Sequence, residues 1–143
     1  MLSFYMTHRN PFKLITLSII TLGIYYAYWY YRTQKQIHTL SKQGPNITTH
    51  ILLSLLTVGL YTIYWHFAVG YYIKNMGGKN HSLIYGTLFS IGYIITILFS
   101  VTFIRNAIGI PTSPTVSYII GATTIFTAVF INMILIQKDI NEI

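Results

Sequence analysis

Few side chains in this sequence can do acid–base, nucleophilic or metal chemistry, and those few are poorly spaced for it. The chain of 143 residues contains no cysteine, which excludes disulfides, thiolate catalysis and cysteine metal sites. Its only acidic side chains are Asp139 and Glu142, which both fall within the last five residues. The apolar segments therefore contain no carboxylate for proton relay, cation coupling or paired-acid hydrolysis.

The five histidines are too far apart in the sequence to indicate a site. No histidine has another three or four residues away, whereas a metal ion needs ligands gathered in space. The run Gly77-Gly78-Lys79 fits a turn rather than a phosphate-binding loop, and there is no Gly-x-Ser-x-Gly elbow. The sequence predicts no enzyme activity, no cofactor and no metal site. We expect the histidines to be polar groups at a membrane–water interface: His8, His38, His50, His66 and His81.

The composition is that of a membrane protein. Hydrophobic residues make up 53% of the chain and charged residues only 8%, whereas soluble domains carry about 25% charged residues. The net charge is +7, and the basic residues lie between apolar segments rather than in one cluster. This pattern disfavours nucleic acid as a partner and favours membrane lipid, in particular anionic headgroups. A second membrane protein and further copies of the chain are the other expected partners.

Four apolar stretches are long enough to be candidates for membrane-spanning segments. Each is close to the ~20 residues that span a ~30 Å hydrocarbon core as a helix. Helices are expected because isolated strands cannot pair their backbone groups in lipid. The predicted fold is an all-α integral membrane protein, a single domain over residues 1–143, with apolar helical segments at residues 12–31, 50–73, 82–104 and 115–136.

The first two segments contain a duplicated phrase. Residues 17–29 and 53–65 are identical at 7 of 13 positions, with an offset of 36. Each copy has an aliphatic run, then Thr-x-Gly, then tyrosines and a tryptophan that share one helical face. We interpret these aromatic faces as structural anchors or a partner surface rather than a catalytic site. The shared residues are Thr21, Gly23, Tyr25, Tyr28 and Trp29 in the first copy, and Thr57, Gly59, Tyr61, Tyr64 and Trp65 in the second.

The aliphatic run in each copy is only half as long as a span requires. Nine helical residues rise ~14 Å, so a break at Gly23 and Gly59 would let each segment turn back as a re-entrant hairpin. In that case eight of the nine basic residues share one side and only Arg105 opposes them, with the termini and the loops around Ser41 and Gly78 in the cytoplasm. If all four segments span, the split is five against four. Plain spanning helices that contain glycine, and a dual topology, are the alternatives.

The last two segments carry small residues at helical spacing. Such residues let helix backbones approach closely, and the third segment has two rows of them on different faces. We expect this segment to be the central packing helix. For Asn132 we expect an interhelical hydrogen bond, with a substrate contact as the alternative. The residues expected at packing contacts are Gly86, Ser90, Gly92, Gly121 and Asn132.

The phrase Thr-x-Gly-x-Tyr-x-x-Tyr-Trp follows Asn10-Pro11-Phe12-Lys13 and an aliphatic run. In this it resembles an uncharacterised family of bacterial multi-pass membrane proteins of unknown function. The resemblance extends from the N-terminus through the second copy of the phrase. It implies a location in the bacterial cytoplasmic (inner) membrane and supplies no catalytic residue.

Two classes of function fit these observations. The first is a small non-enzymatic integral membrane protein that acts as an accessory, interaction, or immunity- or stress-type component. The alternative is a small oligomeric transporter or channel built from the duplicated hairpins. No charged residue marks an ion path in the interior of the apolar runs, which speaks against this alternative.

Overall fold

The computed structural model describes residues 8–110 and 115–143. Within those residues the regular structure is entirely helical, as the sequence predicts. The helices are, in chain order, α1 (Pro11–Ile20), α2 (Ile24–Ser41), α3 (Ile47–Leu56), α4 (Leu60–Asn75), α5 (Ser82–Ala107) and α6 (Thr115–Asn141).

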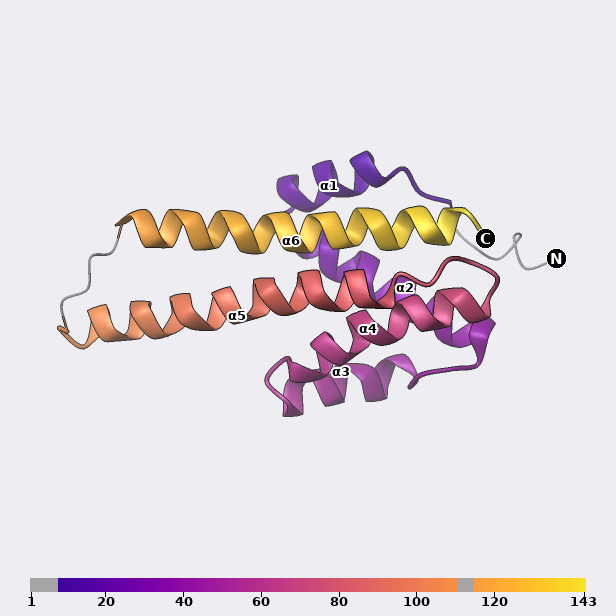
Figure 1. The fold of residues 1–143 in the computed structure, drawn as a ribbon, viewed down its shortest axis with the longest axis horizontal. Helices are drawn as coiled ribbons and strands as arrows, with labels where there is room; N and C mark the ends of the chain where they lie inside the picture. Colours follow the sequence, from indigo (N-terminus) through magenta and orange to yellow (C-terminus); the bar gives the residue numbers. More distant parts are fainter. Residues whose placement is uncertain (1–7, 111–114) are drawn as a thin grey trace.

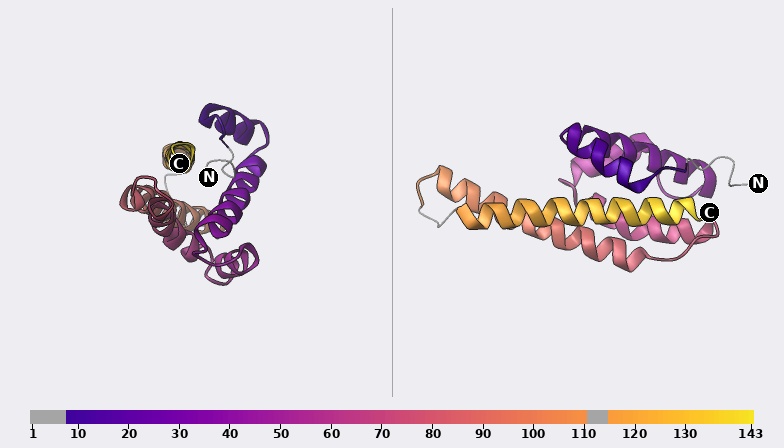
Figure 2. Two further views of the ribbon diagram at one scale, coloured as in Figure 1. Left: turned by 90° about the vertical axis from the view of Figure 1, so that its right-hand side faces the viewer. Right: turned by 90° about the horizontal axis from the view of Figure 1, so that it is seen from above.

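Helices α5 and α6 form a long antiparallel pair that sets the length of the molecule (Figure 1). They contain 26 and 27 residues, so each is ~40 Å long at ~1.5 Å per residue. The short helices α1 to α4 gather around one half of this pair, and the other half extends beyond them (Figure 2). The start of α1, the α2–α3 and α4–α5 connections and the C-terminus all lie at the end with the short helices, which we call the open end (Figure 1).

A tight turn joins α1 to α2, and a second joins α3 to α4. These turns contain Gly23 and Gly59, so both breaks predicted from the sequence are present. Helices α1 and α3 have 10 residues each and are therefore only ~15 Å long. Both turns lie about midway along α5 and α6 (Figure 1). We call α1–α2 hairpin 1 and α3–α4 hairpin 2.

The first two of the four predicted apolar segments are each divided into two helices at the predicted breaks, which gives six helices in the described residues. Helix α2 also continues past Tyr31 to Ser41, through residues that the sequence pattern assigned to a polar connection. The reason is tertiary: Thr33, Gln34 and Ile37 are buried against neighbouring helices, and packing overrides the polar composition of this stretch.

By length and composition, α5 is the one helix in the described part of the chain that could cross a membrane. Helices α1 and α3 are apolar but too short. Much of the α5 surface is apolar and exposed, which a bilayer tolerates and water does not. Its exposed side chains include Ile91, Ile94, Leu98, Val101 and Phe103.

The core lies in the half of the molecule nearer the open end, where the short helices meet α5 and α6. It combines two tryptophans with aliphatic residues from α1, α2, α4 and α6 and one tyrosine from α5. Its most deeply buried members are Leu14, Trp29, Ile37, Trp65, Val69, Ile73, Tyr85, Met133, Ile136 and Ile140.

Candidate functional site

Each turn is held by the threonine of the duplicated phrase. Thr21 Oγ1 accepts a hydrogen bond from Tyr25 N at 2.9 Å. Thr57 Oγ1 accepts one from Tyr61 N, also at 2.9 Å. The threonine that follows one helix therefore caps the first turn of the next, where backbone N–H groups lack helical partners.

The glycines have a conformational reason of their own. Gly23 has φ +91° and Gly59 has φ +87°, in the left-handed region that side chains with a Cβ avoid. Gly23 N donates to Ser18 O at 2.7 Å, and Gly59 N donates to Ser54 O at 2.8 Å. These bonds close the turns without water, which a turn inside hydrocarbon would require. The Thr-x-Gly motif is thus a helix-reversal element.

The tips of both hairpins are apolar and exposed. Leu22 is 95% exposed and Val58 is 82% exposed, although each sits in a tight turn. Turns in water are instead rich in Gly, Pro, Asn, Asp and Ser. The exposed side chains flanking the tips are also aliphatic, including Ile20, Ile24, Leu56 and Leu60. The tips therefore match hydrocarbon better than water.

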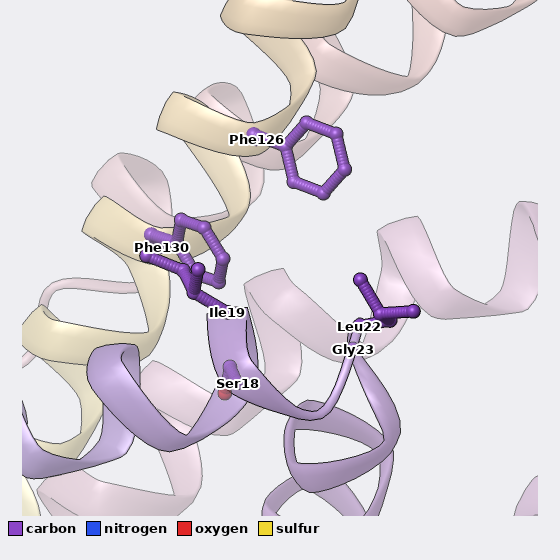
Figure 3. Close-up of a pocket in the computed structure, with 6 residues that line it drawn as sticks. All are labelled: Ser18, Ile19, Leu22, Gly23, Phe126 and Phe130. Atoms are coloured by element: carbon purple, nitrogen blue, oxygen red, sulfur yellow. The ribbon is translucent and has the colours of Figure 1, made fainter.

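The two turns differ in what covers them. In hairpin 2, the Tyr93 hydroxyl of α5 donates to Val58 O at 2.6 Å, and its ring lies beside Gly59. In hairpin 1, the turn instead borders an apolar pocket of about 340 Å³ beside α6 (Figure 3). The pocket is lined by Ser18, Ile19, Leu22, Gly23, Phe126 and Phe130.

The aromatic face of each phrase is divided between core and surface. Trp29 is fully buried, and its indole N–H donates to Gln137 Oε1 of α6 at 2.9 Å. Trp65 is also buried, and its indole N–H donates to Gln34 Oε1 of α2 at 2.5 Å. Each tryptophan thus joins its hairpin to a neighbouring helix.

The tyrosines of the two phrases lie further out than the tryptophans. Tyr28 and Tyr64 are exposed, whereas Tyr25 and Tyr61 are half-buried. The tyrosines, and not the tryptophans, are therefore the members of each phrase that can reach lipid or a partner.

Two histidines are not interfacial groups, contrary to the sequence interpretation. His50 and His66 are buried, because α3 and α4 pack against α2 and enclose them. His50 Nε2 lies 2.6 Å from the Tyr30 hydroxyl, and His66 Nδ1 lies 2.8 Å from Thr62 O. The His66 ring stacks on Phe89 of α5 with centroids 3.7 Å apart.

This histidine cluster is polar but does not have the composition of a metal site. The described residues contain no group of three or more histidine, cysteine or acidic side chains that could hold a metal ion. Trp65 lies edge-on to Tyr30, with ring centroids 4.3 Å apart, so the space between the two hairpins is filled mainly by aromatic rings. His50 Nδ1 is buried and has no partner among the residues that the structure describes.

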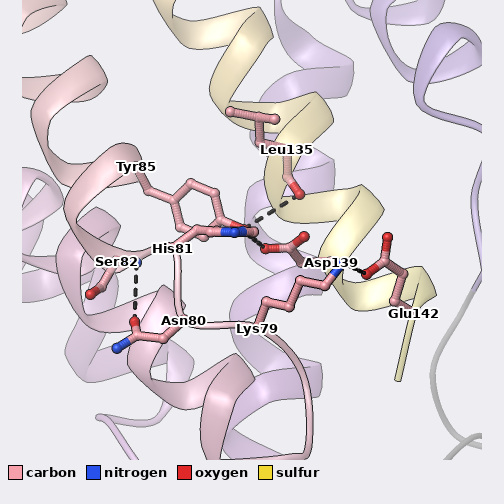
Figure 4. Close-up of polar contacts among 8 residues, drawn as sticks. All are labelled: Lys79, Asn80, His81, Ser82, Tyr85, Leu135, Asp139 and Glu142. Atoms are coloured by element: carbon pink, nitrogen blue, oxygen red, sulfur yellow. Dashed lines mark hydrogen bonds and ion pairs between the residues drawn. The ribbon is translucent and has the colours of Figure 1, made fainter.

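Both acidic side chains lie at the open end and hold the α4–α5 connection to α6 (Figure 4). Asp139 Oδ2 is 2.6 Å from His81 Nδ1 and also accepts a hydrogen bond from the Tyr85 hydroxyl. Lys79 Nζ lies 2.9 Å from Glu142 Oε2. This hydrogen bond raises the pKa of the lysine and lowers the pKa of the glutamate. Sequence reasoning missed these roles, because the partners are more than fifty residues apart in the chain.

The small residues of α5 face two different neighbours. Gly86 lies against the Phe67 ring of α4, and Gly92 lies against Ala128 of α6. Gly121 of α6 lies against the Phe99 ring of α5. These glycines lie where a side chain of one helix meets the backbone of another.

The two polar residues expected at packing contacts behave differently from each other. Asn132 Nδ2 donates to Tyr85 O at 2.7 Å, so the interhelical hydrogen bond expected of it is present. Ser90 Oγ donates its hydroxyl hydrogen to Gly86 O in the same helix. That hydrogen therefore does not bond to a neighbouring helix.

Residues 9–50 match a family model described as a domain of unknown function (DUF4234). The matched region contains hairpin 1, with the first Thr-x-Gly turn, and ends early in α3. No curated protein and no solved structure matches the chain. The comparison is consistent with the resemblance to an uncharacterised family and assigns no activity.

Proposed function

We propose that this chain is a multi-pass protein of the bacterial cytoplasmic membrane that acts without catalysis, as an accessory or interaction component. Hairpins 1 and 2 enter the cytoplasmic leaflet and turn back within it, and α5 and α6 cross the bilayer. The observation that carries the proposal is the pair of exposed apolar tips, Leu22 and Val58. In water these tips would be unfavourable, whereas in hydrocarbon they need no cover.

The lengths of the helices support this arrangement. Helices α1 and α3 are ~15 Å long, which is half of a ~30 Å hydrocarbon core, whereas α5 and α6 at ~40 Å can cross it. Backbone polar groups at such depth need partners within the protein. The turn N–H groups donate to carbonyls of the same hairpin, and Val58 O accepts from the Tyr93 hydroxyl of α5.

The distribution of charge supports a cytoplasmic open end. Eight of the nine basic residues lie on that side in this topology, and Arg105, near the end of α5, lies on the other. Positive charge is enriched on the cytoplasmic side of membrane proteins.

The polar side chains that the fold gathers support a role in binding rather than in catalysis. Thr21 and Thr57 cap helices, and Asp139 holds His81 and Tyr85. Each of these groups is occupied in joining helices. In an immunity- or stress-type role, which is one form of the accessory function, the exposed tyrosines and the apolar surface would contact another membrane component.

Cysteine labelling tests the topology, because the chain contains no cysteine of its own. We expect Ser41→Cys and Lys79→Cys to be protected from a membrane-impermeant thiol reagent in intact cells and to react in inverted vesicles. Ile108→Cys, at the far end of α5, serves as the control and should react from outside. Reaction of Ser41→Cys from outside would refute the re-entrant hairpins, and opposite behaviour of the two open-end positions would restore plain spans.

A small transporter or channel is the second candidate. The buried polar cluster of Tyr30, His50 and His66 favours it, because it lies between two repeated hairpins, and transporter sites lie at the interface between structural repeats. Reconstituted vesicles decide between the two functions. Under the accessory function we expect no protein-dependent ion or solute flux and a stoichiometric partner in a detergent pull-down. A flux abolished by His50→Phe in folded protein would establish the transporter instead.

A further inference from the structure

A chain of hydrogen bonds joins the N-terminal segment to α2 and α6 at the open end. Asn141 Oδ1 accepts from Arg9 N at 3.2 Å, and Asn141 Nδ2 donates to Arg9 O at 2.8 Å. Gln137 Nε2 donates to Asn141 Oδ1 at 2.8 Å, and Gln137 Oε1 accepts from the Trp29 indole. The backbone of Arg9 is therefore held beside the last turn of α6.

Arg32 lies on α2, nearer the open end than Trp29. It follows Trp29 by three residues and shares its face of α2, while Asn141 follows Gln137 by one turn of α6. Helices α2 and α6 both run towards the open end (Figure 1), so one turn beyond Trp29 and one turn beyond Gln137 both lead towards that end. Arg9 therefore lies beside the end of α6, and helical periodicity places Arg32 on the side of α2 from which Trp29 reaches α6.

Both guanidinium groups contain a buried nitrogen without an acceptor. Arg9 Nη1 and Arg32 Nε have no hydrogen-bond partner among the residues that the structure describes. A buried charged donor without an acceptor is costly. The chain cannot supply an acidic side chain, because Asp139 is bound to His81 and Tyr85 and Glu142 is bound to Lys79. An anion from outside the chain would satisfy them.

The apolar pocket of hairpin 1 lies on α1 and α6, the same elements that hold Arg9. Phe130, on the pocket wall, precedes Asn141 by eleven residues, which is ~16 Å along a helix. The one polar residue in the lining is Ser18, whose hydroxyl is directed to Met133 Sδ of α6 at 4.0 Å. The separation between the pocket and Asn141 is close to half the thickness of a ~30 Å hydrocarbon core, which is the depth that the acyl chains of one leaflet occupy.

From these two features we infer a binding site for one anionic phospholipid between hairpin 1 and α6. Arg9 and Arg32 bind the headgroup phosphate, and an acyl chain occupies the pocket beside Gly23 and Phe126. The inference rests on the proposed function, since it requires the open end at the headgroup level and the tip of hairpin 1 in hydrocarbon. It identifies a lipid as a specific partner. The acyl chain would cover the turn of hairpin 1, in the way that Tyr93 covers the turn of hairpin 2.

Lipid retention by the purified full-length chain tests the site. The protein in neutral detergent is titrated with phosphatidylglycerol or phosphatidylcholine, and bound lipid is counted by native mass spectrometry. We expect one phosphatidylglycerol to be held at least about tenfold more tightly than phosphatidylcholine, from charge-assisted hydrogen bonds. Equal retention of the two lipids by the unmodified protein would overturn the proposal without the need for any variant.

Matched variants test each half of the site. Arg32→Gln and Arg9→Gln should each weaken phosphatidylglycerol retention about tenfold. Lys35→Gln, an equal loss of charge on the exposed side of α2, should leave retention unchanged. Ile19→Trp, which fills the pocket, should weaken retention of both lipids, whereas Ile20→Trp, outside the lining, should not. Equal effects within either pair would contradict the site.

Two controls separate the possible failures. Inorganic phosphate should displace the lipid poorly, because it does not use the pocket. Full displacement by phosphate together with normal retention by Ile19→Trp would mean a simple anion site and overturn the lipid proposal. The cysteine-labelling pattern does not depend on lipid retention. Loss of the lipid preference with the predicted labelling intact would therefore refute this inference and leave the topology standing.

Discussion

At the scale of single residues, the motif positions act on the backbone rather than on a substrate. Thr21 and Thr57 cap the second helix of each hairpin, and Gly23 and Gly59 adopt the left-handed conformation that reverses the chain. The two glycines have nearly the same φ but different surroundings. A Cβ at Gly59 would lie 3.2 Å from the Tyr93 ring, whereas a Cβ at Gly23 would meet nothing within 4 Å.

Gly59→Ala should therefore destabilise the protein more than Gly23→Ala. Both changes incur the left-handed strain of ~1–2 kcal/mol. Gly59→Ala also displaces Tyr93 and weakens its hydrogen bond to Val58 O, which adds about 1 kcal/mol. Thermal unfolding of the two variants in the same detergent measures the difference. Equal melting temperatures would show that the contact with Tyr93 contributes nothing to stability.

At the scale of elements, α5 holds the molecule together because small residues let it approach two helices. Gly86 admits the Phe67 ring of α4, and Gly92 admits Ala128 of α6. Asn132 of α6 adds a hydrogen bond to the α5 backbone. In a membrane, where burial of apolar area between helices provides little drive, close approach and such hydrogen bonds carry the association.

Gly86→Ala should accordingly disrupt folding more than Leu83→Ala, although the first change only adds a methyl group and the second truncates a large side chain. A Cβ at Gly86 would lie 2.1 Å from Phe67 Cδ1, so ring and helix must move apart, at about 1–3 kcal/mol. Leu83 is exposed on the same helix and serves as the matched control. The measurement is the fraction of folded protein recovered after heating in detergent. A larger loss for Leu83→Ala would contradict close packing at Gly86.

At the scale of the whole molecule, contacts at the open end join segments that are far apart in the sequence. The N-terminal segment, the α4–α5 connection and the end of α6 meet there through Arg9, Asn141, His81 and Asp139. The two acidic side chains of the chain occupy different environments at this end. Asp139 is almost fully buried and has two partners, whereas Glu142 forms an exposed pair with Lys79.

Asp139→Asn should lower the unfolding free energy by about 1–3 kcal/mol, because a neutral amide accepts more weakly than the carboxylate and adds an N–H donor beside the Tyr85 hydroxyl. Glu142→Gln should leave the melting temperature unchanged, since exposed ion pairs contribute little. Equal destabilisation by the two variants would contradict the difference in burial.

The pH dependence of the Lys79–Glu142 pair has a defined sign. The pair lowers the pKa of Glu142, so its contribution is present above the unfolded pKa of the glutamate and is lost as pH falls through the folded pKa. It raises the pKa of Lys79, so the contribution is also lost as pH rises through the folded pKa of the lysine. Melting curves of the unmodified chain and Glu142→Gln should therefore coincide at acidic pH, and any separation between them is confined to the range between these two limits.

The sequence by itself determined the helical fold and the two breaks, and it predicts a membrane protein. The composition predicts a lipid environment, because a chain with 8% charged residues has too few charged side chains to cover its apolar surface in water. The breaks at Gly23 and Gly59 are local, because the threonine cap and the left-handed glycine act within four residues of each other. Spacing also indicated which residues of α5 are small enough for close contact.

Only the tertiary structure decided which side chains are buried and what they meet. Spacing predicts that Tyr28 and Trp29 lie near one face, but in the structure the tryptophan is buried with its indole bonded to Gln137 of α6, and the tyrosine is exposed. The burial of His50 likewise depends on helices that the sequence does not place. Asp139 looked like part of a polar tail, and its pairing with His81 arises because antiparallel α5 and α6 bring together residues 58 apart in the chain. Helical periodicity assigns each residue to a face of its own helix, whereas the packing of the helices decides which neighbour that face meets.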